Sequence, residues 1–131
     1  MKPISTEDAP VAIGPYSQAV RMAGFVFLSG QIPLDPKTGE LVAGGSDAQT
    51  AQVMKNLGAV LAAAGCGFGD VVKTTIYLID LKDFQDVNAV YAKSFSGAFP
   101  ARATVQVAAL PRGARVEIDA IAAVRVTATG A

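Results

Sequence analysis

Arg102 and Glu117 are the two charged residues around which this sequence could build a chemical site. Arg102 lies near the start of segment 100–110, PARATVQVAAL, whose alternation is typical of a β-strand. The two faces of such a strand carry Arg102, Thr104 and Gln106 on one side, and Ala103, Val105 and Val107 on the other. We expect the second, apolar face to pack in the core. Glu117 follows in the next strand, across a short turn at 111–113, so we expect it to share a region with Arg102.

An arginine and a glutamate at one place could act on a small carboxylic acid. The arginine fork binds a carboxylate through two parallel hydrogen bonds, which a lysine cannot do. A nearby carboxylate can take a proton from water and so activate it. The alternative for Arg102 and Glu117 is an ion pair on the sheet surface, which contributes only ~0–1 kcal/mol.

Tyr16 and Asn88 are further candidate site residues, although each could also have an ordinary structural role. Tyr16 stands in the segment GPYSQAV, where it is either part of a pocket or a strand aromatic with its hydroxyl in water. Asn88 lies in the middle of a predicted helix, although asparagine is a mediocre helix former. That position hints at a hydrogen-bonding role.

The sequence contains no histidine, which narrows the chemistry available to it. Histidine is the usual general base near neutral pH and the commonest metal ligand, so His-dependent triads, dyads and metal sites are excluded. The single cysteine, Cys66, is expected to be a small packed residue. The glycines of GCGFGD at 65–70 follow a predicted helix, whereas a phosphate-binding loop precedes one. Any catalysis must therefore use carboxylates, Tyr, Lys, Arg, backbone groups and water.

The elements that must position these residues follow the order ββαβαββ. Strands are predicted at 16–21 and 25–30 as a hairpin, at 71–79, in segment 100–110, and at 114–126. A first helix is capped by Ser46 or Asp47 and ends at Gly65, and a second occupies 83–99. We expect an α+β fold in which both helices cover one face of a mixed sheet, as a single domain over 1–131. The other face lacks a dense charge pattern, so burial against further copies of the chain predicts a homo-oligomer.

Composition limits the protein class. Of the 131 residues, 51% are hydrophobic and 17% charged, which favours a folded domain over disorder. Eleven Lys and Arg balance eleven Asp and Glu, and this argues against a nucleic-acid-binding surface. No apolar run reaches the ~18 residues of a membrane helix. The first ten residues lack the apolar core of a secretory signal, so we expect a cytoplasmic protein with no membrane partner.

Beyond these patterns, the chain resembles the RidA (YjgF-type) family of enamine/imine deaminases. The resemblance rests on several motifs in the right order: IGPYSQAV, FVFLSGQIPLDPKTGELV, TAQVMKNLGAVLAAAG, DVNAVYAKSF and PARATVQVAALPRGARVEIDAIA. It covers nearly the whole chain. Its most specific part is the PAR triplet followed by the strand VEIDAIA.

The resemblance implies a chorismate-mutase-like fold of the bacillus type, assembled as a homotrimer with an active site in each cleft between subunits. The implied reaction is hydrolysis of 2-imino acids such as 2-iminobutanoate and 2-iminopropanoate, or of their enamine tautomers, to 2-oxo acids and ammonia. Pyridoxal-phosphate enzymes such as threonine and serine dehydratases release these intermediates. The resemblance implies that the deaminase itself needs no cofactor and no metal.

The resemblance also implies roles for individual residues. Arg102 would hold the substrate carboxylate, Glu117 would activate the attacking water, and Tyr16 would line the pocket and assist proton transfer. Ser29, Gly30 and Asn88 match pocket segments of the family. The backbone at Thr104 would bind substrate; many relatives have cysteine there, so a thiol mechanism at this position is excluded.

Three alternatives remain open from the sequence. The protein could bind 2-oxo or amino acids without turning them over, because a fold does not determine a function. It could act on a larger enamine. Endoribonuclease or chaperone behaviour is also associated with the family, but the balanced charge and the missing histidine disfavour a dedicated ribonuclease.

Overall fold

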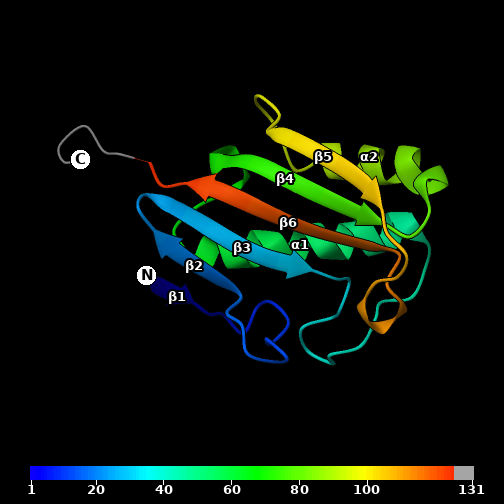
Figure 1. Ribbon diagram of the computed structural model, residues 1–131, viewed down its shortest axis with the longest axis horizontal. Helices are drawn as coiled ribbons and strands as arrows, with labels where there is room; N and C mark the ends of the chain where they lie inside the picture. Colours follow the sequence, from blue (N-terminus) through cyan, green and yellow to red (C-terminus); the bar gives the residue numbers. More distant parts are fainter. Residues whose placement is uncertain (126–131) are drawn as a thin grey trace.

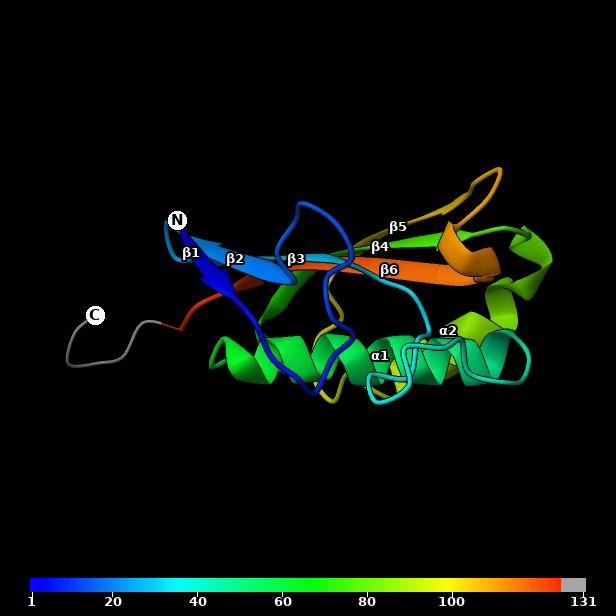
Figure 2. The same ribbon diagram turned by 90° about the horizontal axis from the view of Figure 1, so that it is seen from below.

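The computed structural model describes residues 1–125 as a six-stranded sheet with two helices packed on one face. Figure 2 shows the two layers, with the sheet above and both helices below it. The strands lie in the order β1-β2-β3-β6-β4-β5, all antiparallel to their neighbours except the parallel pair β4 and β5. The prediction of two helices on one face of a mixed sheet is confirmed. Strand β1 was not predicted.

The first three strands form a meander at one edge of the sheet. They are β1 (Lys2–Ile4), β2 (Ala19–Met22) and β3 (Phe25–Gln31). The predicted hairpin is present, and its two-residue loop has positive φ at both Ala23 (54°) and Gly24 (81°). Such a loop matches the twist of the flanking strands. The predicted start of the first strand at residue 16 is wrong, because residues 16–18 lie in the loop that precedes β2.

Helix α1 (Ser46–Ala63) packs its apolar residues across the middle of the sheet. Its apolar side chains Val53, Leu57, Val60 and Leu61 are buried, as is Ala64 at its C-cap. Gly65 follows with φ 77°, as expected of the glycine that ends a helix. The predicted side-chain cap is wrong, because Gly45 is the N-cap and makes no side-chain hydrogen bond. Asp47 instead lies in the first turn, where a negative charge suits the helix dipole.

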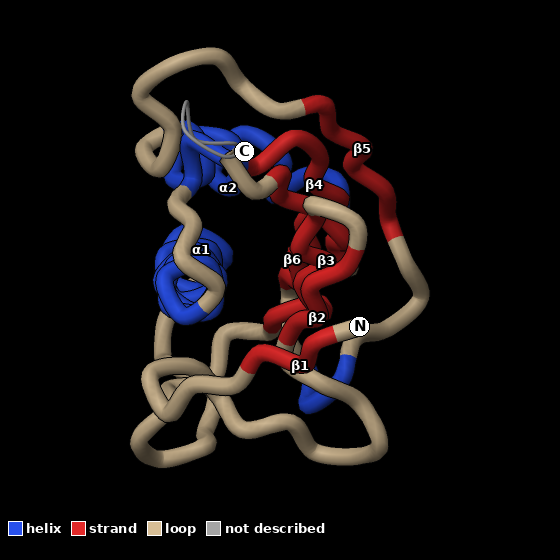
Figure 3. The backbone as a smooth tube through the Cα atoms, turned by 90° about the vertical axis from the view of Figure 1, so that its left-hand side faces the viewer, coloured by secondary structure: helices blue, strands red, loops and turns tan. Residues whose placement is uncertain are grey.

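Helix α2 (Phe84–Ala92) links the parallel strands β4 (Val71–Leu78) and β5 (Ala101–Gln106). It is shorter than the predicted 83–99, because a turn region of serines and glycine follows Lys93. Phe95 still packs beneath the sheet, its ring centroid 4.9 Å from that of Tyr91. Figure 3 shows α1 and α2 side by side on one side of the sheet, with β5 at its edge.

Strand β6 (Val116–Ala123) lies in the centre of the sheet, between β3 and β4. Its even-numbered residues Val116, Ile118, Ala120 and Ala122 are buried against the helices. Its odd-numbered residues, including Glu117, therefore point to the open face of the sheet. The strand ends at Ala123, and the last residue of the predicted strand, 126, lies outside the described residues.

Candidate functional site

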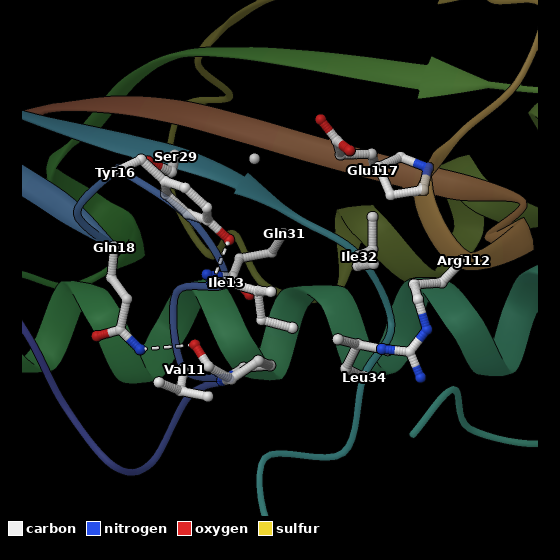
Figure 4. A pocket seen from close by; sticks show the side chains of 13 residues that line it. Val11, Ile13, Tyr16, Gln18, Ser29, Gln31, Ile32, Leu34, Arg112 and Glu117 are labelled. Atoms are coloured by element: carbon white, nitrogen blue, oxygen red, sulfur yellow. Dashed lines mark hydrogen bonds between the residues drawn. The ribbon is translucent and has the colours of Figure 1, made fainter. Parts of the chain in front are cut away.

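Glu117 lies in a cavity of about 560 Å³ at one end of the central strands. The walls come from the loop before β2, the end of β3 with the loop after it, and the turn before β6. They are formed by Pro10, Val11, Ile13, Tyr16, Gln18, Ser29, Gly30, Gln31, Ile32, Leu34, Pro111, Arg112 and Glu117. Figure 4 shows Glu117 projecting from β6, with Tyr16 beside Ser29. The predicted residues Tyr16, Ser29, Gly30 and Glu117 thus share one cavity.

The Glu117 carboxyl is half-buried in this cavity. Burial raises the pKa of this carboxyl, and the charge of Asp119 raises it further. A carboxylate with a raised pKa is a better general base near neutral pH than an ordinary glutamate. Gly30 makes room for it, because a Cβ at that position would lie 2.9 Å from Cδ and 3.1 Å from Cγ of Glu117.

The Tyr16 ring is placed by hydrogen bonds within its own loop and to β3. The Tyr16 hydroxyl accepts a hydrogen bond from the Ile13 backbone N–H at 3.3 Å. The Ser29 hydroxyl donates to the Ser17 carbonyl oxygen at 2.6 Å, which ties this loop to β3. Ser29 therefore helps to position Tyr16, whose side chain is half exposed to solvent.

Gln18 is a buried residue of this site that the sequence did not indicate. Its side-chain N–H donates to the carbonyl oxygens of Pro10 (2.7 Å) and Thr6 (3.1 Å), and its oxygen accepts from the Thr6 N–H at 2.7 Å. These bonds hold residues 6–10 against β2 and explain why 16–18 are not part of a strand. A single glutamine before an apolar strand carries no pattern that would reveal this.

Arg102 lines a second, smaller cavity of about 310 Å³, formed with Asn88, Tyr91, Ala92, Phe99 and Pro100. Its Nη1 donates to Oδ1 of Asn88 at 2.8 Å. The guanidinium carbon lies 5.3 Å from the ring centroid of Tyr91 and 5.5 Å from that of Phe84, within the range of cation–π attraction. Asn88, for which the sequence hinted at a hydrogen-bonding role, therefore has Arg102 as its partner.

The guanidinium of Arg102 keeps its charge free for a ligand. Among residues 1–125, the ion pairs are those of Lys82, Arg115 and Arg125, and Arg102 forms none. The ring of Tyr91 is itself fixed, because its hydroxyl and that of Thr74 share a hydrogen bond of 2.7 Å. No pattern in the sequence indicated that the aromatic residues of α2 contact Arg102.

Arg102 and Glu117 of one chain do not meet, contrary to the prediction that they share a region. Strand β4 separates β5 from β6, and its Thr74 pairs with Arg102 whereas its Tyr77 pairs with Glu117. The Arg102 side chain lies on the helix-covered side and Glu117 on the open face. A surface ion pair between the two is therefore excluded within one chain.

The expected packing of β5 is also wrong. Arg102 and Gln106 contact α2 and the turn before it, since Oε1 of Gln106 accepts from the Leu81 N–H at 2.9 Å. Val105, expected in the core, is 41% exposed on the open face. Thr104 lies on the side of Arg102, and within residues 1–125 its buried hydroxyl has no hydrogen-bond partner. The reason is that β5 is an edge strand, where helix α2 reaches only part of one face.

Comparison with known proteins places the chain in a family. A family model described as Endoribonuclease L-PSP matches residues 6–124. The 2-iminobutanoate/2-iminopropanoate deaminase of Mus musculus is 58% identical over 121 residues, covering 92% of this chain and 90% of its own. The structure of RidA from the Antarctic bacterium Psychrobacter sp. matches with a TM-score of 0.91 at 47% identity, over 95% of this chain and all of that one.

A third similar protein has a ligand in its structure. Escherichia coli TdcF with bound serine matches with a TM-score of 0.90 at 42% identity, over 95% of this chain and 100% of its own. The family match, the sequence identity and the shared fold all extend over nearly the whole chain, and they confirm the resemblance seen in the motifs. The chain therefore belongs to the RidA family, whose sequence model carries the description Endoribonuclease L-PSP.

Proposed function

We propose that the protein is a hydrolytic deaminase that converts 2-imino acids and their enamine tautomers, such as 2-iminobutanoate and 2-iminopropanoate, to 2-oxo acids and ammonia. The relative named for this activity, at 58% identity, supports the assignment. The observation on this chain that carries it is Arg102, a guanidinium held by Asn88 and two aromatic rings with its charge unpaired among residues 1–125. Such an arginine suits the carboxylate of a small acid.

The proposed active form is a homotrimer in which the Glu117 cavity of one subunit faces the Arg102 cavity of the next. Two features of the chain support this arrangement. The two cavities hold complementary parts of one site and lie on opposite sides of the sheet. The open face also carries exposed large apolar side chains, among them Phe25, Phe27 and Val105, and a soluble protein seldom leaves such a patch uncovered.

In the proposed mechanism, Arg102 binds the substrate carboxylate while Asn88 orients the guanidinium. The backbone at Gly30 and Thr104 completes the binding site. Glu117 takes a proton from water as the hydroxide adds to the imine carbon, and passes that proton to the nitrogen. The resulting carbinolamine then transfers its hydroxyl proton to nitrogen through Glu117, the C–N bond breaks, and ammonia and the 2-oxo acid leave. Tyr16 borders the water and assists these transfers.

Each step of this mechanism is within reach of the residues present. An imine is already electrophilic, so the enzyme needs mainly to orient substrate and water and to stabilise developing charge. The raised pKa of Glu117 suits a group that must both take up and release a proton. The serine bound to the TdcF protein carries a carboxylate and a nitrogen on one carbon, as a 2-imino acid does, which supports an amino-acid-like ligand.

The activity is tested in a coupled assay, in which a threonine or serine dehydratase releases the imine and formation of the 2-oxo acid is followed. Wild-type protein is expected to accelerate that formation. Arg102→Ala is expected to abolish the acceleration, and Arg102→Lys to recover little of it, because a point charge cannot replace the fork. Full activity of Arg102→Ala would refute the assignment of Arg102.

The shared site is tested by mixing two inactive variants, Arg102→Ala and Glu117→Gln, by unfolding and refolding them together. If a site combines Arg102 of one subunit with Glu117 of the next, random trimers restore about one quarter of the sites. If both residues came from the same subunit, mixing would restore none. Each variant refolded alone is the control.

The name of the family model raises RNA cleavage as a second activity, which this chain does not favour. Its formal net charge is zero, and it has no histidine to serve as acid and base. Ribonuclease activity that persists in repurified Glu117→Gln and Arg102→Ala proteins would reopen that function. We further propose that the deaminase works in the cytoplasm, beside the pyridoxal-phosphate dehydratases that release its substrates, without a cofactor of its own.

A further inference from the structure

Asp119 lies next to Glu117 on the open face of β6 and is held there by a tyrosine. The Tyr77 hydroxyl donates to Oδ2 of Asp119 at 2.9 Å. In the strand register, Tyr77 is directly opposite Glu117, whereas Thr75 is opposite Asp119. The Tyr77 side chain therefore leans diagonally across the two strands, a reach that long aromatic side chains can make. This contact keeps the Asp119 carboxylate on the same face as Glu117.

The surroundings of these two carboxylates contain few other charges. The titratable or charged side chains on this face and around the cavity are Lys73 and Tyr77 from β4, Asp119 from β6, and Tyr16 and Arg112 at the cavity wall. Within residues 1–125, neither Glu117 nor Asp119 forms an ion pair with any of them. On this face β5 contributes only the uncharged Ala101, Ala103 and Val105. Asp119 is therefore the nearest fixed charge along the strand from Glu117.

We propose that Asp119, fixed by Tyr77, is a positioning residue whose negative charge acts on Glu117 in the water-activation step. This inference rests on the proposed function for its consequence in catalysis. Residues two apart on a strand lie about 6–7 Å from each other, so the two carboxylates repel without touching. The tyrosine donor holds the Asp119 carboxylate at this place on the strand. Of the pair, Glu117 is the carboxyl that lines the cavity, and it is the one proposed to take up the proton.

The shifts in the pKa of Glu117 and in the pKa of Tyr77 agree with this arrangement. The pKa of the Glu117 carboxyl is raised, first by burial and then by the charge of Asp119. The pKa of Tyr77 is also raised, chiefly by its hydrogen bond to Asp119, so its hydroxyl keeps the proton that it donates. Two carboxyl groups with different surroundings often divide acid and base roles between them.

The proposal is tested without any need for activity by carbon-13 NMR titration of the glutamate carboxyl signals. The chain has three glutamates, and two of them, Glu7 and Glu40, are exposed, so they serve as internal references in each spectrum. Glu117→Gln identifies the third signal. Asp119→Asn, which keeps the shape and removes the charge, is expected to move the Glu117 midpoint to lower pH by roughly half a pH unit.

Tyr77→Phe tests the hydrogen bond that holds Asp119 separately from the charge of Asp119. Without the phenol donor, Asp119 can turn towards solvent, so the Glu117 midpoint is expected to move in the same direction by a smaller amount. Asp47→Asn is the matched control: it removes an exposed aspartate on α1, across the sheet, and is expected to leave the midpoint unchanged. An unchanged midpoint in Asp119→Asn overturns the proposal, and an unchanged midpoint in Tyr77→Phe overturns the role of Tyr77.

The pH profile of kcat/KM then reports the consequence for catalysis. Because Glu117 must be ionised to act as a base, the acidic limb of Asp119→Asn is expected to move to lower pH with the NMR midpoint. A shifted midpoint with an unshifted acidic limb would leave the influence of Asp119 on Glu117 standing and would refute Glu117 as the base. Failure of the inference and failure of the proposed function are thus distinguishable.

Discussion

Gly30→Ala is the substitution that most directly tests how the Glu117 carboxylate, the proposed catalytic base, is placed. The added Cβ would lie 2.9 Å from Cδ and 3.1 Å from Cγ of Glu117, and closer still to Oε2. Real Cβ atoms essentially never approach other heavy atoms more closely than 3.0 Å. The methyl group therefore meets the body of the Glu117 side chain as well as its tip, and a small rotation of the carboxylate cannot relieve the contact.

The cost of this clash falls on catalysis more than on folding. To clear the methyl group, Glu117 must move by about 1 Å, and a displacement of that size can lower a rate ~10²-fold. Overpacking costs ~1–3 kcal/mol in a closed core, and we expect the low end because Glu117 can turn into the open cavity. The expected result is a ~10²-fold fall in kcat/KM with a loss of about 1 kcal/mol in the free energy of unfolding.

The assay is the coupled 2-oxo acid measurement together with urea unfolding. Gly67→Ala is the matched control, because a Cβ there meets no heavy atom within 4 Å and the residue has φ −139°, which any residue adopts. In a Glu117→Ala background, Gly30→Ala should cost almost no stability, since the clashing side chain is gone. Wild-type kcat/KM in Gly30→Ala, or an equal loss of stability in both backgrounds, would refute this account of Gly30.

Three further substitutions test the energetics around the site. Glu117→Gln should raise the melting temperature at pH 8. Folding raises the pKa of the Glu117 carboxyl, so this group makes the wild-type protein less stable as pH rises. Below pH ~4, Glu117 is protonated in both the folded and the unfolded protein, and the gain from the substitution should vanish. Tyr91→Phe should cost ~1–3 kcal/mol in urea unfolding, because the buried Thr74 hydroxyl loses its partner, yet alter KM little, since the ring beside the guanidinium remains. An unchanged unfolding free energy would contradict this role for the hydroxyl. Asp83→Ala should lower the free energy of unfolding by ~1–3 kcal/mol, because Arg115 contacts both Asp83 oxygens. The loss should be smaller than for a fully buried pair, since the Arg115 side chain is 38% exposed. An unchanged free energy of unfolding would count against a stabilising role for the pair.

The parts of the fold that were predicted from the sequence are those decided by local signals. The apolar spacing of α1, the glycine that ends it and the turn at Ala23 and Gly24 each depend on a few neighbouring residues. The strand β1 has no such signal, because it has only three residues and one of them is a proline. It is a strand only because it pairs with β2. The order of the strands in the sheet could not be predicted from local signals either. Strands β5 and β6 are neighbours in the chain, but β4 lies between them in the sheet.

Four of the candidate site residues, Tyr16, Ser29, Gly30 and Glu117, share one cavity, whereas the predicted meeting of Arg102 with Glu117 is wrong for a single chain. The cavity around Glu117 brings together Tyr16, Ser29 and Gly30, as the family motifs implied. Arg102 lies on the opposite side of the sheet from Glu117, because the face of β5 that carries Arg102 packs against α2. Alternation alone cannot tell which face of an edge strand is covered, because neither face of β5 is fully buried.

The separation of Arg102 from Glu117 within one chain has a physical advantage for the proposed reaction. If the two side chains were in contact in a single subunit, they would form an ion pair, which would lower the proton affinity of Glu117 and occupy the fork that must bind substrate. On opposite sides of the sheet, the guanidinium rests on an amide and two aromatic rings, none of which neutralises it. In the proposed trimer, the substrate carboxylate then neutralises Arg102 at the moment when the imine carbon comes within reach of the water on Glu117. Burial and the charge of Asp119 can therefore keep Glu117 basic while a cation is held in the same cleft.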